Sequence, residues 1–89
     1  MYNITDYSFE KAAELGLTIK PSTRKGKKID VYKDDDYLVS IGSIKNFDYP
    51  TYVLEKGKAY AEKRKALYHQ RHRKDLKHFK GFVAMYILW

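Results

Sequence analysis

The chain has 89 residues, no cysteine and a formal net charge of +7 at pH 7. Its length allows one small domain, 1–89, and a hydrophobic content of 44% is enough for a packed core. The composition excludes disulfides and thiolate metal sites, and the longest apolar stretch, residues 82–89, is too short to cross a membrane. The first residues do not have the pattern of a secretory signal.

The charge is unevenly distributed along the chain. Residues 1–55 carry eight Lys and Arg against nine Asp and Glu, whereas residues 56–89 carry ten against two. Because repulsion within the basic part destabilises the compact state, a polyanionic partner is the natural explanation. A solvated lysine face without any partner is the alternative.

Residues 1–17 are expected to form an N-terminal helical segment. A short helix is predicted over residues 8–15, with Ser8 as its N-cap and Gly16 directly after its end.

Residues 18–47 are expected to form a β-hairpin region. Hydrophobic residues alternate with polar ones over 29–33 and again over 37–41, around an acidic connection at residues 34–36. Since two strands alone are unstable, we expect a third strand, from residues 18–20 or from Ile44.

A long basic helix is expected within residues 48–78. Pro50 suits its first turn, Thr51 can cap it, and it should extend to His72 or slightly beyond, with Gly57 as a weak point. The apolar segment 79–89 can be a last helix or a last strand. The predicted fold class is therefore α+β, with a small antiparallel sheet of two to three strands packed on one long basic helix, and a short N-terminal helix.

The basic helix supplies the main candidate binding residues. On a helical wheel, Arg64 and Arg71 share a sector with tyrosines, whereas Lys65 and His72 face the opposite side. Arginine and lysine can neutralise phosphates, and neighbouring tyrosines can stack on bases. Alternatively, the two arginines only cover the core and pair with Asp48 or Glu55. The predicted nucleic-acid contacts of this helix are Arg64, Lys65, Arg71, His72, Arg73 and Lys74.

A second basic cluster precedes the hairpin. A glycine, Gly26, lies among four cations and lets the backbone approach a phosphate closely. The predicted contacts of this cluster are Arg24, Lys25, Lys27 and Lys28.

Metal and catalytic sites are not indicated by the sequence. The acidic run 34–36 lacks the ligand spacing of a calcium loop and is better explained as a polar turn. Three histidines, His69, His72 and His78, have no cysteine or acidic ligand in a supporting position, and neighbouring cations oppose zinc. No nucleophile, paired-carboxylate or phosphate-loop motif stands out, so we expect no enzyme, no metal and no cofactor.

Three stretches carry a resemblance to a viral family. They are S-T-R-K-G-K-K-I-D-V-Y…Y-L-V-S-I-G over 22–42, D-Y-P-T-Y-x-x-E-K-G-x-x-Y-A-x-x-R-x-x-L-Y-x-x-R-H-x-K over 48–74, and K-G…I-L-W over 80–89. Together they resemble short proteins of large double-stranded DNA viruses, the phycodnaviruses and mimivirus relatives. The resemblance implies a viral origin, and hence a place in the virion or in the nucleus or cytoplasm of a host cell.

The expected function is sequence-independent nucleic-acid binding, with DNA favoured over RNA and no membrane partner. Two alternatives use the same basic helix. The first is a minor capsid or virion assembly protein that meets an acidic protein surface. The second is an RNA- or ribosome-binding host-interaction factor.

Overall fold

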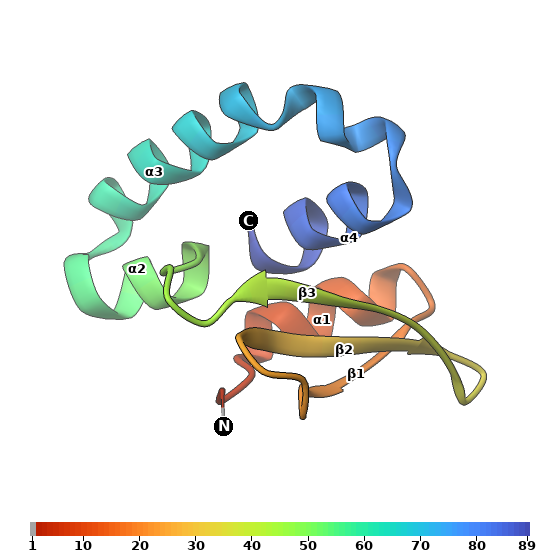
Figure 1. Ribbon diagram of the computed structural model, residues 1–89. Coiled ribbons are helices and arrows are strands. Elements are labelled where there is room, and N and C mark those ends of the chain that lie inside the picture. Colours follow the sequence, from red (N-terminus) through yellow and green to blue (C-terminus); the bar gives the residue numbers. More distant parts are fainter. Residues whose placement is uncertain (1) are drawn as a thin grey trace.

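In the computed structural model, which describes residues 2–89, a three-stranded antiparallel sheet packs against helices (Figure 1). The predicted α+β class is confirmed. In chain order the elements are α1 (Asp6–Glu14), β1 (Thr18–Pro21), β2 (Lys27–Lys33), β3 (Asp36–Ser43), α2 (Tyr49–Lys56), α3 (Lys58–Arg71), the 3₁₀ helix η1 (Arg73–Lys77) and α4 (Phe79–Leu88).

The sheet has the order β1-β2-β3, so the hairpin gains its third strand from residues 18–21 and not from Ile44. The predicted acidic turn is confirmed: Lys33 pairs with Asp36, and the two residues between them have positive φ, 50° at Asp34 and 70° at Asp35. Two consecutive left-handed residues are typical of the tight type I′ turn, and aspartate tolerates this conformation better than most residues.

The core lies where the sheet meets the two terminal helices. β2 and β3 contribute Ile29 and Ile41, and α4 contributes Ile87 and Leu88. The undecided C-terminal segment is thus a helix. It is joined to α1 by the buried Ser8, whose Oγ donates to the Ile87 carbonyl at 2.8 Å.

The start of α1 differs from the sequence prediction. The N-cap is Thr5, whose side chain accepts from the Ser8 backbone N–H at 3.3 Å. The prediction of Ser8 as the cap was wrong because the side chain of Ser8 bonds to α4 instead, a contact that no local pattern reveals. Gly16 follows the helix as expected, with φ 71°.

The predicted long basic helix is two helices. Gly57, with φ 91° and ψ 161°, separates α2 from α3 in a conformation that is essentially restricted to glycine. Its N–H donates to the Val53 carbonyl and its own carbonyl accepts from Ala61, so Gly57 ends one helix and begins the next. The cap of α2 is Asp48, which accepts from the Thr51 N–H at 3.0 Å, and Pro50 lies in the first turn as predicted.

The helices α3, η1 and α4 form an arch above the sheet, and the C-terminal end of the described chain lies beneath it (Figure 1). α3 has one buried residue, Ala61, so most of its side chains face solvent or the space under the arch. Within residues 2–89, no helix combines the length and the apolar character that crossing a membrane requires.

Candidate nucleic-acid interface

A groove of about 750 Å³ lies under the arch. One wall is formed by residues of α2 and α3, and the other by the connection from β3 to α2, including Lys45 and Phe47. The C-terminal end of α4 closes it, with Leu88 and Trp89. The groove thus joins segments that are far apart in the sequence.

Basic side chains dominate the charge of this groove. No aspartate or glutamate lines it in the part of the chain that the structure describes, 2–89. Because all but one of the groove cations lack an ion-pair partner in residues 2–89, the groove favours an anionic ligand. Its lysines and arginines are Lys27, Lys28, Lys45, Lys56, Arg64 and Arg71.

The two arginines of α3 lie in the groove without an ion-pair partner in residues 2–89. The guanidinium of Arg64 lies over the Tyr52 ring, 5.6 Å from its centroid, while its Nε is buried and forms no hydrogen bond. The arginines therefore do not form the alternative ion pairs with Asp48 or Glu55. Arg71 lies nearly two turns further along the same helix.

Lys28 has a structural role. It is 4% exposed, and its Nζ lies 2.9 Å from Oδ2 of Asp48, which also accepts from the Tyr2 hydroxyl at 2.6 Å. Burial acts to raise the pKa of Asp48, but the hydrogen bonds from Tyr2 and Thr51 and the charge of Lys28 outweigh it and hold this pKa below its usual range. The prediction that Lys28 contacts phosphate was wrong, because its ammonium group is used inside the fold.

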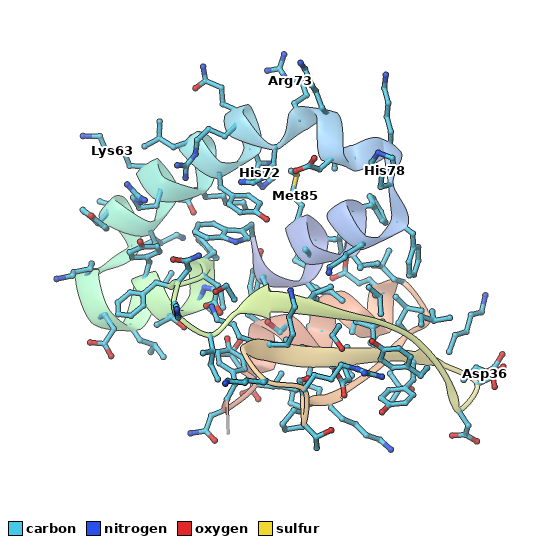
Figure 2. The ribbon with its side chains drawn as sticks, in the orientation of Figure 1. Asp36, Lys63, His72, Arg73, His78 and Met85 are labelled. Atoms are coloured by element: carbon cyan, nitrogen blue, oxygen red, sulfur yellow. The ribbon has the colours of Figure 1, made fainter. Side chains whose placement is uncertain are left out.

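Stacked rings form the inner part of the groove. Tyr68 lies between Trp89, at 4.3 Å and 7°, and His72, at 4.2 Å and 27°. Both faces of Tyr68 are therefore occupied. His72, which was expected on the opposite side of the helix, faces inward (Figure 2), because it lies four residues after Tyr68 and its backbone N–H donates to the Tyr68 carbonyl as in an α-helix.

The outer part of the groove has aromatic side chains that remain accessible. Tyr52 contacts Phe47 at 5.3 Å and Tyr60 at 5.6 Å between ring centroids, with interplanar angles of 65° and 50°. These tilted arrangements leave ring surface uncovered, and Phe47 and Tyr60 are 44% and 45% exposed. They are the groove aromatics that a ligand can reach.

Three predicted contacts from the helical segment lie outside the groove. The ammonium group of Lys65 lies 4.7 Å from the centroid of the Tyr49 ring, and Glu62, beside the Tyr49 hydroxyl, raises the pKa of that tyrosine to about 12. Arg73 and Lys74 are exposed on η1, and Arg73 points away from the sheet (Figure 2). Lys65 therefore packs against α2 and does not line the groove.

The basic cluster before the hairpin is also divided. Lys27 lines the groove, whereas Lys25 is exposed in the loop and does not. The Arg24 guanidinium lies 4.4 Å from the centroid of the Tyr37 ring, which is not a groove residue. The loop is fixed by the buried Asp30, which accepts from Ser22 Oγ at 2.6 Å.

Sequence reasoning missed most of the aromatic side chains and two of the cations that line the groove. Phe47 and Trp89 belong to the loop before α2 and to the end of α4, so no periodicity connects them with α3. A signal existed for Tyr52, which belongs to the tyrosine-rich motif, but the helix break at Gly57 changes its position relative to Tyr60. The missed cations are Lys45 and Lys56.

Metal-binding geometry was not found in residues 2–89, where no three His, Asp or Glu side chains come together. The histidines have other neighbours. His72 Nδ1 lies 2.7 Å from Asp75 Oδ2, and His69 Nε2 lies 3.3 Å from the Trp89 carbonyl oxygen.

Comparisons with known proteins give no relative from which a role could be transferred. No family model, no curated protein and no solved structure matches the chain significantly. The class that the fold and the site define is a small α+β protein with a basic, aromatic groove.

Proposed function

We propose that this protein is a non-enzymatic nucleic-acid-binding protein that contacts phosphates from the groove without reading sequence. The observation that supports the proposal is the set of five lysines and arginines that line the groove without an ion-pair partner in residues 2–89. These are Lys27, Lys45, Lys56, Arg64 and Arg71.

Phosphate binding explains why the positive charge is gathered there. Each neutralised phosphate releases condensed counterions, so a cluster of lysines and arginines favours a polyanion over single small anions. Arginine adds geometry, because its planar guanidinium can donate two parallel hydrogen bonds to one phosphate. The guanidinium of Arg64 lines the groove and has no ion-pair partner in residues 2–89.

Sequence-independent binding fits the same arrangement. Phosphate contacts carry no sequence information by themselves, and the sequence contains no recognisable base-reading motif. The resemblance to proteins of DNA viruses makes DNA the first ligand to test, and a virion protein that meets an acidic protein surface the main competing role.

The test is a fluorescence-anisotropy titration with labelled DNA at three salt concentrations. Five phosphate contacts predict a slope of log K against log salt of about −3.5 for single strands and about −4.5 for duplexes. Scrambled sequences of equal length should bind within a few-fold of one another.

Polyglutamate serves as the polyanion that lacks phosphate. It should compete poorly at equal charge concentration. No DNA binding at about 50 mM salt would refute the proposal, and polyglutamate binding as tight as DNA binding would favour an acidic protein partner instead.

A further inference from the structure

The groove is concave, and its shape restricts which nucleic acid can enter it. Its volume of about 750 Å³ lies within the range of about 300–1,000 Å³ that is usual for sites that enclose small organic ligands. A duplex presents its phosphates on a convex rod with the bases stacked inside, so it reaches only the rim. An unpaired nucleotide can enter with its base and its phosphate together.

Aromatic ring surface is available where such a base would lie. Phe47 and Tyr60 are 44% and 45% exposed, and both belong to the groove lining. The inner rings cannot serve, since Tyr68 is already stacked on both faces by Trp89 and His72. Every base has a π-face, so stacking on these rings is tolerant of sequence.

A phosphate donor lies next to these rings. Arg64 contacts Tyr52, the ring against which both Phe47 and Tyr60 pack. Its guanidinium lines the groove and has no ion-pair partner in residues 2–89. Stacking surface and phosphate donor are thus parts of one cluster, as single-strand binding sites require.

We infer that the groove binds single-stranded nucleic acid, with an unpaired base stacked on Phe47 or Tyr60 and the adjoining phosphates held by Arg64 and Arg71. This inference rests on the proposed function and names its ligand class. It adds a preference for unpaired over duplex strands, which phosphate binding alone does not require.

The groove contains its own spectroscopic reporter. Trp89 is the only tryptophan of the sequence, and it lines the groove. A single-stranded oligothymidylate of about 12 nucleotides should change the Trp89 emission and bind at least about tenfold more tightly than a duplex of equal length. The duplex should leave the emission nearly unchanged.

Two substitutions remove the stacking surface and leave the charge unchanged. Tyr60→Leu and Phe47→Leu should each weaken single-strand binding by about tenfold and leave duplex binding unaltered. Phe9→Leu is the matched control, because Phe9 is 47% exposed on α1 and outside the groove. Circular dichroism and melting temperature confirm that each variant is folded.

An abasic oligonucleotide of the same length separates bases from phosphates. The wild-type protein should bind it about tenfold more weakly than oligothymidylate, and Tyr60→Leu should add no further loss. Duplex binding as tight as single-strand binding, or folded Tyr60 and Phe47 variants with full single-strand affinity, would overturn the inference and leave the proposed function standing. Salt-independent binding, or no binding to either DNA, would overturn both.

Discussion

Asp34 and Asp35 form the turn between β2 and β3 with φ of 50° and 70°, and Asp36 adds a third carboxylate beside them. Asparagine followed by glycine suits a type I′ turn better, because glycine adopts positive φ without strain. The double change Asp34→Asn and Asp35→Gly should stabilise the fold by about 0.5–1 kcal/mol.

Thermal unfolding measures this effect. In a domain of this size, 1 kcal/mol corresponds to about 4–8 °C in melting temperature, so an increase of several degrees is expected. The control is Asp35→Ala with Asp34 unchanged. This variant should have a lower melting temperature than the wild type. No increase in the Asn-Gly variant would contradict the turn assignment.

The buried carboxylates connect stability to pH. Burial acts to raise the pKa of Asp48 and of Asp30, but hydrogen bonds and a nearby cation, Lys28 for Asp48 and Arg24 for Asp30, lower both pKa values overall. Their contribution is therefore complete above the unfolded pKa of about 3.9 and is lost as pH falls through the lower folded values. Urea unfolding should show these contributions intact at pH 7 and decreasing below about pH 4.

Asp48→Asn tests which group causes the decrease. It should lower the free energy of unfolding at pH 7 by about 3–5 kcal/mol, because Lys28 loses its buried counter-charge, and it should flatten the profile below pH 4. Asp36→Asn, which removes an exposed carboxylate, should keep the wild-type profile. An unchanged acid profile in Asp48→Asn would contradict this account.

Among the elements, the junction of α2 and α3 determines whether the groove exists. Gly57 has φ 91° and ψ 161°, and a Cβ there would meet no atom within 4 Å, so the penalty for a side chain is backbone strain and not a clash. Gly57→Ala should destabilise the fold by about 1–3 kcal/mol, or allow α2 and α3 to join and shift Tyr60.

Melting temperature and Trp89 emission together check this prediction. Either response should also weaken DNA binding, because α3 carries one wall of the groove. Ala59→Gly, inside α3 and exposed, is the control for helix propensity and should cost only about 1 kcal/mol. A Gly57→Ala protein with wild-type stability, emission and binding would show that the junction has no such role.

The local sequence pattern was sufficient to predict the fold class and the hairpin. The alternation over residues 29–41 and the acidic turn both depend on neighbouring residues, which is why strands and turn were predicted correctly. The break at Gly57 was not predictable in the same way, because a glycine inside a helix costs only about 1 kcal/mol and is often tolerated. Its actual conformation depends on how α2 and α3 pack.

The candidate site was predictable only in part. Arg64 and Arg71 were identified because arginines among tyrosines form a pattern within one helix. Lys28 was misassigned because its partner, Asp48, lies 20 residues further along the chain. Phe47 and Trp89 were missed because only the tertiary fold brings the loop before α2 to the end of α4.

At the scale of the whole molecule, net charge alone cannot identify the binding surface. Residues 56–89 carry ten lysines and arginines, but several of them, such as Arg73 and Lys63, point away from the groove (Figure 2). A polyanion attracted only by net charge would respond equally to the loss of any two cations. A polyanion bound in the groove would lose affinity mainly when the removed cations line the groove.

The most direct test compares two double variants with the same change in charge. Arg64→Gln with Arg71→Gln removes two groove cations, and Lys33→Gln with Lys63→Gln removes two exposed cations outside it. The slope of log K against log salt for single-stranded DNA should become less steep by about 1.4 in the groove variant, about 0.7 for each lost contact, and stay unchanged in the control. Equal slopes and equal affinities in the two folded variants would contradict the groove as the binding surface.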